Sequence, residues 1–326
     1  MFENSRVLIT GGTGSWGNVL TEKLLSKNPN EIIIFSRGEL QQVLMKRKFN
    51  NPKIKFIIGD VRDYEALNDA CKGVDYIFHL AALKHVPVCE EQPQEAIKTN
   101  INGTTNLVNA AIKNKVKKVI DVSTDKACDP LNLYGMTKAV GEKLVIQANN
   151  ISDTRFVCIR GGNVMGSNGS VIPFFKEMIN NGGPITVTDF NMTRFFLTLG
   201  EAIDLLFKAA ESSYGGETFV MNMPACYIKD LCEVLIEDSG KEIELKEIGM
   251  RPGEKLDEIL VSQHEALTSY EYDSDYWVIL PTLPIKNLDV NYYKKFNKVN
   301  FKEFTSKTKI MNKEQIKVML KNGGFI

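Results

Sequence analysis

Short apolar runs alternate with helix-like segments through the first half of the chain. Apolar, β-branched residues at positions 6–10, 31–35, 55–58, 76–80, 119–122 and 156–159 predict strands. These runs are continuous rather than alternating, which is typical of strands buried on both faces of a parallel sheet. Apolar spacing at 19–26 and 102–113 predicts helices between them. The expected fold class is therefore α/β, with a Rossmann-type, doubly wound parallel sheet.

The pattern changes past about residue 166, where turns, prolines and glycines become denser. Segments 185–188 and 243–247 predict short strands of a smaller α+β lobe. An amphipathic helix over 200–212 is expected to return to the first domain. We therefore expect a dinucleotide-binding domain over 1–165 and a substrate-binding lobe over 166–326. Their cleft should lie at the carboxyl ends of the parallel strands.

A glycine-rich turn directly follows the first predicted strand. Gly11, Gly14 and Gly17 have the spacing GxxGxxG and precede a predicted helix. Glycine permits the tight turn and lets backbone N–H groups approach a pyrophosphate at the positively polarised helix N-terminus. The turn therefore predicts dinucleotide binding by Gly11, Thr13, Gly14, Ser15, Trp16 and Gly17.

The end of the second predicted strand indicates which dinucleotide binds. An acidic residue there would bind the ribose diol of NAD and repel a 2′-phosphate, but this chain has Ser36 and Arg37. Because a hydroxyl beside a guanidinium suits a phosphate monoester, we expect NADP. Asp60 and Val61, after the third strand, are expected to bracket the adenine. The other expected cofactor contacts are Ala81, Ala82, Lys84, Tyr134 and Lys138.

The fifth predicted strand ends in Ser123-Thr124-Asp125-Lys126, and a Tyr-x-x-x-Lys pair follows at Tyr134 and Lys138. That spacing places both side chains on one helix face. Free tyrosine has a pKa of about 10, and the Lys138 cation with an oxidised nicotinamide would stabilise its phenolate. A shift of about three units requires roughly 4 kcal/mol. Tyr134 can then take the proton of an alcohol while hydride leaves the same carbon.

These residues resemble those of an extended short-chain dehydrogenase/reductase. More narrowly, the chain is similar to the inverting UDP-N-acetylglucosamine 4,6-dehydratases, which serve bacterial surface-sugar synthesis such as that of pseudaminic acid. The resemblance spans nearly the whole chain in order. It rests on FSRGEL (35–40), LKHVP (83–87), STDKA (123–127), NLYGMTK (132–138), GNVMGSNGSVIPFF (162–175), MTRFF (192–196) and RPGEK (251–255).

The resemblance implies a role for each catalytic residue. Tyr134, with Lys138, would start oxidation at C4 of the hexose, and Thr124 would hydrogen-bond the reacting O4. Lys126 would work at C5, and Asp125 would assist loss of the 6-hydroxyl as water. Hydride would return to C6, giving a UDP-4-keto-6-deoxy-L-hexosamine. A plain epimerase needs only the hydride pair, so Asp125 and Lys126 favour dehydration.

The resemblance also implies contacts to a UDP-sugar, whose phosphates need cationic and backbone donors. Arg194 and Arg251 are candidates for the phosphates and uridine, and Glu254 for the uridine ribose. Lys84 would lie over the nicotinamide and the hexose. Asn163 and the loop 167–171, including Ser170 and Val171, would line the path between sugar and pyrophosphate.

Two positions depart from the family pattern and leave alternatives open. Gly161 stands where the family commonly has Tyr, so a 5,6-unsaturated UDP-sugar is an alternative product. Gln41 stands where a Lys often supports the 2′-phosphate. A UDP-hexose 4- or 5-epimerase on the same scaffold and a nucleotide-sensing protein without catalysis are the other hypotheses. A nucleotide-sensing protein without catalysis would be expected to lack Tyr134 or Lys138, and both are present.

Composition narrows the partners. Lys plus Arg and Asp plus Glu each number 40, so the formal net charge is zero, and neither nucleic acid nor an anionic membrane is the expected partner. Three scattered histidines and six cysteines without a CxxC pair predict no metal site and a reducing compartment. The sequence shows no signal peptide and no apolar stretch of membrane-spanning length. We expect a cytoplasmic homo-oligomer, a dimer or larger.

Overall fold

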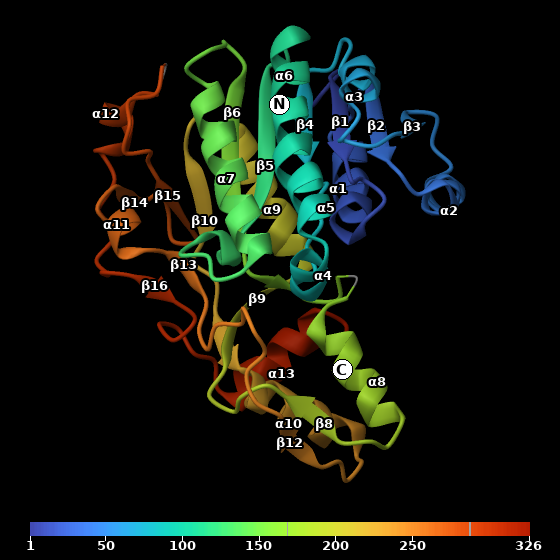
Figure 1. Cartoon of the computed structure of the whole chain (residues 1–326), viewed down its shortest axis with the longest axis vertical. Helices are drawn as coiled ribbons and strands as arrows, with labels where there is room; N and C mark the ends of the chain where they lie inside the picture. Colours follow the sequence, from blue (N-terminus) through green and yellow to red (C-terminus); the bar gives the residue numbers. More distant parts are fainter. Residues whose placement is uncertain (168, 287) are drawn as a thin grey trace.

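A nine-stranded sheet forms the centre of the computed structural model, which describes residues 1–167, 169–286 and 288–326 (Figure 1). Its strand order is β14-β15-β10-β6-β5-β4-β1-β2-β3. The neighbouring strands β10, β6, β5, β4, β1, β2 and β3 are parallel to one another. Strand β15 is antiparallel to β10, and β14 is antiparallel to β15. The bounds are β1 (Arg6–Thr10), β2 (Glu31–Ser36), β3 (Ile54–Ile58), β4 (Tyr76–His79), β5 (Lys118–Thr124), β6 (Arg155–Gly161), β10 (Thr218–Met221), β14 (Ser269–Glu271) and β15 (Tyr276–Ile279).

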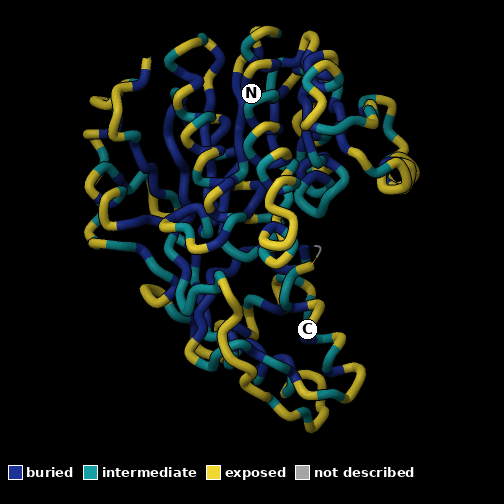
Figure 2. The backbone as a smooth tube through the Cα atoms, viewed as in Figure 1, coloured by how far each residue is buried: buried dark blue, intermediate teal, exposed yellow. Residues whose placement is uncertain are grey.

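The six strands predicted from apolar runs correspond to β1 to β6, and the Rossmann-type α/β fold is confirmed. Both faces of β1, β2, β4, β5 and β6 are largely buried, whereas β3, at the edge of the sheet, is mostly half-buried or exposed (Figure 2). In β1, for example, Val7 and Ile9 belong to one apolar core and Leu8 to the core on the opposite face. Burial on both faces explains why the strands read as continuous apolar runs.

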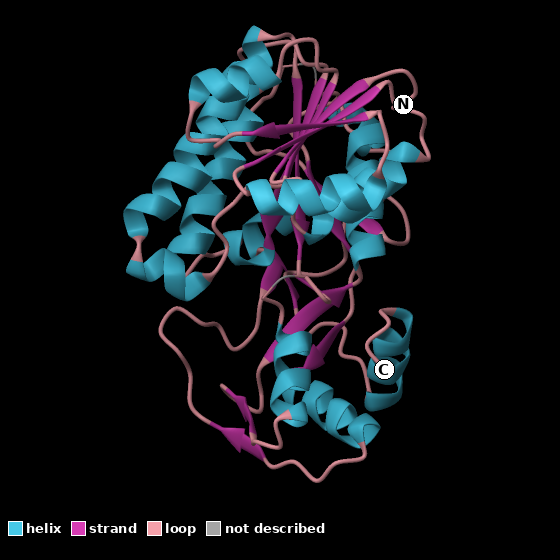
Figure 3. Cartoon of the chain, turned by 90° about the vertical axis from the view of Figure 1, so that its right-hand side faces the viewer, coloured by secondary structure: helices cyan, strands magenta, loops and turns pink. Residues whose placement is uncertain are grey.

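Helices cover both faces of the sheet (Figure 3). Helices α3 (Tyr64–Ala70), α6 (Gly103–Lys113) and α7 (Leu133–Ala148) pack on the face of Leu8. Helices α1 (Ser15–Leu25) and α9 (Leu199–Ser212) pack on the other face. The remaining elements of this half are α2 (Glu39–Phe49), α4 (Val86–Glu91), α5 (Pro93–Ile97), the π-helical turn η1 (Lys98–Asn102) and the 3-10 turn η2 (Asp125–Ala127).

A separate apolar core stabilises the smaller lobe, the lower part of Figure 1. Phe175, Leu231 and Ile316, from three helices, lie in this core. The lobe contains α8 (Val171–Asn180), β8 (Ile185–Val187), α10 (Ile228–Ser239), β12 (Leu245–Glu247) and α13 (Lys313–Asn322). The remaining shorter elements are β7 (Asn163–Val164), β9 (Thr193–Leu197), β11 (Ala225–Tyr227), β13 (Ile259–Val261), α11 (Gln263–Ala266), α12 (Val290–Tyr293) and β16 (Phe304–Thr305).

The structure divides the chain differently from the boundary expected after residue 165. Strands β10, β14 and β15 follow that residue, yet they belong to the large sheet. Helix α9 packs on the large sheet, in keeping with the expected return of the helix over 200–212. The chain therefore passes between the two parts several times. Local apolar patterns reveal a strand but not the sheet that it joins, which explains the difference. Within the described residues, no helix is long and apolar enough to cross a membrane.

The buried imidazole of His79, at the end of β4, makes folding stability dependent on pH. Its Nδ1 lies 2.6 Å from Thr10 Oγ1 and its Nε2 lies 3.3 Å from Thr104 Oγ1. The side chain is only 1% exposed. Burial is the largest effect and lowers the pKa of His79 to about 4, although the charge of Asp121 acts in the opposite direction. The imidazole is therefore neutral in the folded protein.

We expect His79 to destabilise the folded protein below neutral pH. Its ordinary pKa of about 6.5 applies to the unfolded chain, so that state gains the proton first. The stability that the neutral His79 contributes to the folded protein is fully present above pH 6.5 and is lost as the pH falls towards about 4. Between pH 7.5 and 5, this loss is about 2 kcal/mol. Urea unfolding at both pH values should show a smaller decrease for His79→Asn, and an equal decrease would contradict the assignment.

Candidate functional site

A cavity of about 830 Å³ lies at the carboxyl ends of the parallel strands. All the expected cofactor residues except Lys138 line it: Gly11, Thr13, Gly14, Ser15, Trp16, Gly17, Ser36, Arg37, Asp60, Val61, Ala81, Ala82, Lys84 and Tyr134. Thr124, Lys126, Asn163, Ser170 and Val171 also line it. Asp125 and Lys138 lie behind its wall, and Arg194, Arg251 and Glu254 are not among its lining residues. Residue 168, in the expected loop 167–171, lies outside the described residues.

The glycine turn forms one end of this cavity. Gly11 has a φ of +66°, and Gly14 is the N-cap of α1 without a side-chain hydrogen bond. A Cβ on Gly17 would lie 2.1 Å from the carbonyl oxygen of Gly12. The turn can therefore pack against the start of the helix only because no side chain intervenes. This geometry leaves backbone N–H groups at the start of α1 for an anion.

Ser36 and Arg37, at the end of β2, have a partner that the sequence analysis missed. The buried side chain of Gln42 donates from Nε2 to the Ser36 hydroxyl oxygen at 3.0 Å. Because Ser36 accepts this hydrogen bond, its own O–H can donate elsewhere. Arg37 is largely exposed, and its Nη1 lies 3.8 Å from Asp60. Gln42 shares the buried side of α2 with Met45, and the sequence alone does not show that this polar residue is buried.

The buried Asn100 of η1 positions the loop that carries Ala81, Ala82 and Lys84. Its Oδ1 accepts a hydrogen bond from Leu83 N at 2.8 Å, and its Nδ2 donates to Leu83 O at 2.9 Å. The same Nδ2 lies 3.0 Å from Thr137 Oγ1 on α7. One side chain therefore fixes the cavity loop relative to the helix that carries Tyr134.

Thr124, Asp125 and Lys126 form a compact turn at the end of β5. Asp125 Oδ1 accepts hydrogen bonds from Thr124 Oγ1 at 2.9 Å and from Lys126 Nζ at 3.0 Å. Gly135 permits α7 to approach this turn, because a Cβ there would lie 2.1 Å from Lys126 O. The glycine inside NLYGMTK therefore places Tyr134 beside the Asp125–Lys126 pair.

Lys138 faces the buried carboxylate of Asp121 on β5, with 3.4 Å between Nζ and Oδ2. Burial lowers the pKa of Lys138, but Asp121 and the other nearby negative groups outweigh it, and the net shift is upward. For Tyr134, burial is the largest effect and raises the pKa, while Lys138 and Lys126 lower it. The protein's own charges therefore do not give the lowered pKa of Tyr134 that we expected, and the positive charge of an oxidised nicotinamide would have to supply it.

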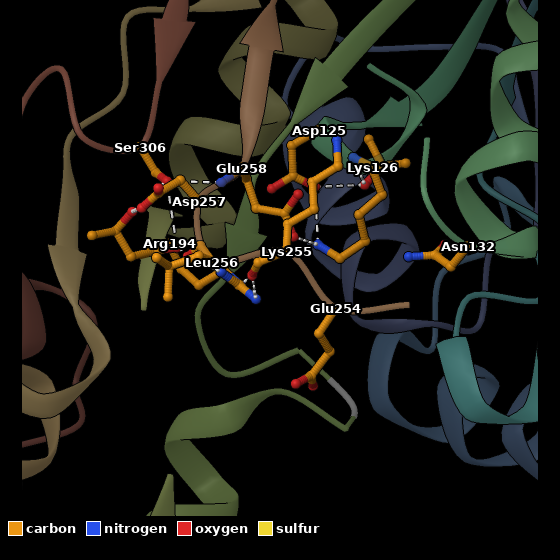
Figure 4. A network of polar contacts seen from close by, with 12 residues as sticks. Asp125, Lys126, Asn132, Arg194, Glu254, Lys255, Leu256, Asp257, Glu258 and Ser306 are labelled. Carbon is orange, nitrogen blue, oxygen red and sulfur yellow. Dashed lines mark hydrogen bonds and ion pairs between the residues drawn. The ribbon is translucent and has the colours of Figure 1, made fainter. Parts of the chain in front are cut away.

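Sequence analysis also missed Glu258, which faces Lys126 (Figure 4). Its carboxylate lies 3.4 Å from Lys126 Nζ and 3.6 Å from Arg194 Nε. Burial opposes the charge of Lys126, but Asp125 and Glu258 outweigh that effect, and the pKa of Lys126 is raised. Burial is also the largest effect on Asp125, and its pKa is raised. No local motif indicates Glu258, because it lies 132 positions after Lys126 in the chain.

Arg194 occupies a different position from the phosphate contact that we expected. Its guanidinium donates to the carbonyl oxygens of Thr193, Leu256 and Lys255 at 2.7 to 3.0 Å. These bonds attach the segment before β13 to β9. Arg251 is exposed, and its backbone N–H lies 3.4 Å from the Glu254 carboxylate. In this conformation none of the three side chains Arg194, Arg251 and Glu254 reaches the cavity wall.

A second helix N-terminus, that of α8, also reaches the cavity. Ser170, its N-cap, makes no side-chain capping bond, and Ser170, Val171 and Ile172 line the wall. Trp16 and Gly161 also line the cavity, and a Cβ on Gly161 would lie 3.6 Å from the Trp16 indole. The two N-termini, of α1 and α8, can therefore each receive a phosphate group. No group of three or more His, Cys, Asp or Glu suited to a metal ion occurs in the described parts of the chain.

Comparisons with known proteins confirm the resemblance inferred from the sequence blocks. A family described as "Polysaccharide biosynthesis protein" matches residues 7–279. A UDP-N-acetylglucosamine 4,6-dehydratase (inverting) of Campylobacter jejuni is 45% identical over 297 residues, which cover 90% of this chain and 87% of that protein. A UDP-glucose 4-epimerase of Rickettsia bellii is 43% identical and covers 100% of this chain and 98% of its own length. The X-ray structure of Pen from Bacillus thuringiensis matches with a TM-score of 0.93 and 39% identity, covering 100% of both chains.

We expect Gly17→Ala to weaken binding of the dinucleotide cofactor by about fivefold or more, because overpacking of this kind costs about 1–3 kcal/mol. Gly161→Ala is the matched control, since its Cβ makes only an ordinary contact with Trp16. The control should keep its affinity within about threefold. Isothermal titration calorimetry of both variants, after circular dichroism has shown that they fold, measures the difference. Equal affinities would contradict the close approach at Gly17.

Proposed function

This chain belongs to the polysaccharide biosynthesis protein family, and on that premise we propose that it dehydrates UDP-N-acetylglucosamine with NADP as a recycled cofactor. One observation carries the proposal. Tyr134, the residue suited to alcohol oxidation, shares a cavity wall with Lys126, whose Nζ is hydrogen-bonded to Asp125. Oxidation and the two proton transfers of water loss can therefore act on one hexose.

The glycine turn and the end of β2 carry residues that fit NADP. The N-terminus of α1 suits a pyrophosphate, and the free donor of Ser36 with Arg37 suits a 2′-phosphate. NADP supplies the hydride acceptor for oxidation at C4 and the hydride donor for reduction at C6. At C4, Tyr134 takes the hydroxyl proton, and Lys138 lies one helical turn behind it.

Asp125 and Lys126 can perform the elimination with one shared proton. Passage of that proton from Nζ to Oδ1, across 3.0 Å, gives a neutral amine and a carboxylic acid. The amine then takes the proton at C5. The acid passes its proton to the departing 6-hydroxyl, which leaves as water, through the hydroxyl of Thr124, which lines the cavity and lies 2.9 Å from Oδ1. Lys126 is again an ammonium and Asp125 a carboxylate, so the charges of the pair are restored. The raised pKa of Asp125 supports its part as an acid.

The sugar nucleotide is assigned to the wall opposite the glycine turn. The N-terminus of α8 with Ser170 would receive its diphosphate. Asn163 and Lys84 line the wall between this helix and the catalytic residues and would contact the sugar. Arg194, Arg251 and Glu254 are left out of this assignment because they do not reach the cavity.

A UDP-hexose 4-epimerase is the second candidate, because the Rickettsia bellii relative with that name is about as similar as the dehydratase. Epimerisation requires Tyr134 and Lys138 but not the acid–base pair. Release of a 5,6-unsaturated sugar is a third candidate reaction, which we consider because Gly161 stands where the family commonly has Tyr.

We further propose a cytoplasmic homo-oligomer, supported by six buried free cysteines and by exposed apolar side chains of α7 such as Met136 and Val140.

The protein incubated with UDP-N-acetylglucosamine and NADP in deuterated water should lose one water per hexose. Proton NMR and mass spectrometry should show a C6 methyl group, deuterium at C5 and an L-configured ring. Vinylic C6 protons would instead identify the unsaturated product. A substrate that is unchanged or epimerised at C4 would exclude the dehydratase. Tyr134→Phe is the control, and its turnover should fall by at least about a hundredfold while NADP binding persists.

We expect Arg37→Asp to reverse the preference between the two dinucleotides. The new carboxylate would repel the 2′-phosphate of NADP and accept hydrogen bonds from the ribose diol of NAD. The dissociation constant for NADP should rise at least about tenfold while that for NAD stays equal or falls. Calorimetric titration with both dinucleotides measures the ratio. An unchanged ratio would exclude a contact between Arg37 and the 2′-phosphate.

A further inference from the structure

Glu258 lies behind the cavity wall, directly before β13, and its side chain points towards Lys126 (Figure 4). The residue is only 2% exposed. Its Oε1 lies 3.4 Å from Lys126 Nζ, and the second carboxylate oxygen has no hydrogen-bond partner among the described residues. A carboxylate with so little solvent must draw its stabilisation from the neighbouring cations.

The backbone of Glu258 is fixed by a residue from a distant part of the chain. Its N–H donates to Ser306 Oγ at 2.9 Å, and its carbonyl oxygen accepts from Ser306 N at 2.9 Å. Ser306 Oγ also lies 2.6 Å from Thr193 Oγ1 on β9. These bonds give the carboxylate a defined place relative to the lysine, which is what a positioning residue requires.

Glu258 completes a cluster of four charges, two negative and two positive. Asp125 and Glu258 face Lys126, and Glu258 also faces Arg194. The other titratable groups whose charges act on this cluster are Tyr134 on α7 and Lys255. Burial raises the pKa of Glu258, but Lys126, Arg194 and Lys255 outweigh it, and the pKa is lowered overall. Glu258 is therefore ionised, and its loss would leave the cluster with a net positive charge.

We propose that Glu258 is a positioning residue for Lys126: with Asp125 it holds the amine at the cavity wall and stabilises the ammonium formed when Lys126 takes the proton from C5. The proposal rests on the proposed dehydration. Asp125 accepts the hydrogen bond from Lys126 Nζ and can exchange a proton with it. Glu258 provides a second carboxylate, which does not line the cavity. The arrangement separates the group that exchanges a proton with the lysine from the group that orients it.

The charge of Lys126 can be measured without any turnover. The side chain is 22% exposed at the cavity, so acetic anhydride should acetylate its neutral amine, and peptide mass spectrometry should follow the modification as pH rises. In Glu258→Gln the onset of acetylation should move to lower pH by about one unit or more, because a nearby opposite charge is removed. Glu258→Asp keeps the charge and should shift the onset less.

Glu265→Gln is the control for the loss of a paired carboxylate. Glu265 is half-buried and pairs with Arg160 at 2.7 Å instead of Lys126. This variant should unfold more easily and leave the acetylation of Lys126 at the wild-type pH. Thermal unfolding of all variants shows that the acetylation is measured on folded protein.

The reaction supplies the second readout. In Glu258→Gln, deuterium uptake at C5 from deuterated water should fall by roughly tenfold or more near its maximum, and its rise with pH should level off at a lower pH. Oxidation at C4, followed as reduced cofactor in a single turnover, should stay close to that of the wild type. Glu258→Asp should keep the wild-type pH dependence of deuterium uptake.

An unchanged onset of acetylation in Glu258→Gln would overturn the proposal, and so would an equal loss of C4 oxidation and C5 exchange. Acetylation does not depend on the substrate. If Glu258→Gln shifts the acetylation of Lys126 while the wild type dehydrates no UDP-sugar, the contact between Glu258 and Lys126 stands and only the proposed dehydration fails.

Discussion

The cluster of Asp125, Lys126, Arg194 and Glu258 is the constraint on which the arrangement of the two lobes depends. A buried charge is costly unless it is paired and hydrogen-bonded, and each of these four has an opposite charge within 4.0 Å. Two members lie at the end of β5, one on β9 and one before β13. The charges can balance only when these three segments meet. The catalytic turn and the second lobe are therefore held together by the same contacts that set the charge of Lys126.

Close backbone approach is the second requirement of the site. Gly17 lets the start of α1 pack on the turn that precedes it, and Gly135 lets α7 pack on the carbonyl oxygen of Lys126. The first contact forms the end of the cavity that we assign to the pyrophosphate, and the second brings Tyr134 to the proposed acid–base pair. Both glycines act through the absence of a side chain, so the cavity depends on their small size as much as on its polar groups.

The relatives illustrate how one scaffold can support two reactions. Proteins about equally similar to this chain are named as a dehydratase and as an epimerase. In the proposed mechanism, Tyr134 and Lys138 serve alcohol oxidation, and water loss additionally requires acid and base groups near C5 and C6. We assign those groups to the hydrogen-bonded Asp125 and Lys126, with Glu258 beside them.

The sequence by itself determined the features that local periodicity controls. Apolar runs predicted β1 to β6, glycine spacing predicted the dinucleotide turn, and the four-residue spacing of Tyr134 and Lys138 predicted a shared helix face. Only the tertiary structure decided that β10, β14 and β15 join the large sheet, that Arg194 turns to backbone carbonyls, and that Glu258 faces Lys126. Periodicity reports the exposure of each residue along its own element. The partner of a buried charge depends instead on which distant segments pack together, and no local pattern records that choice.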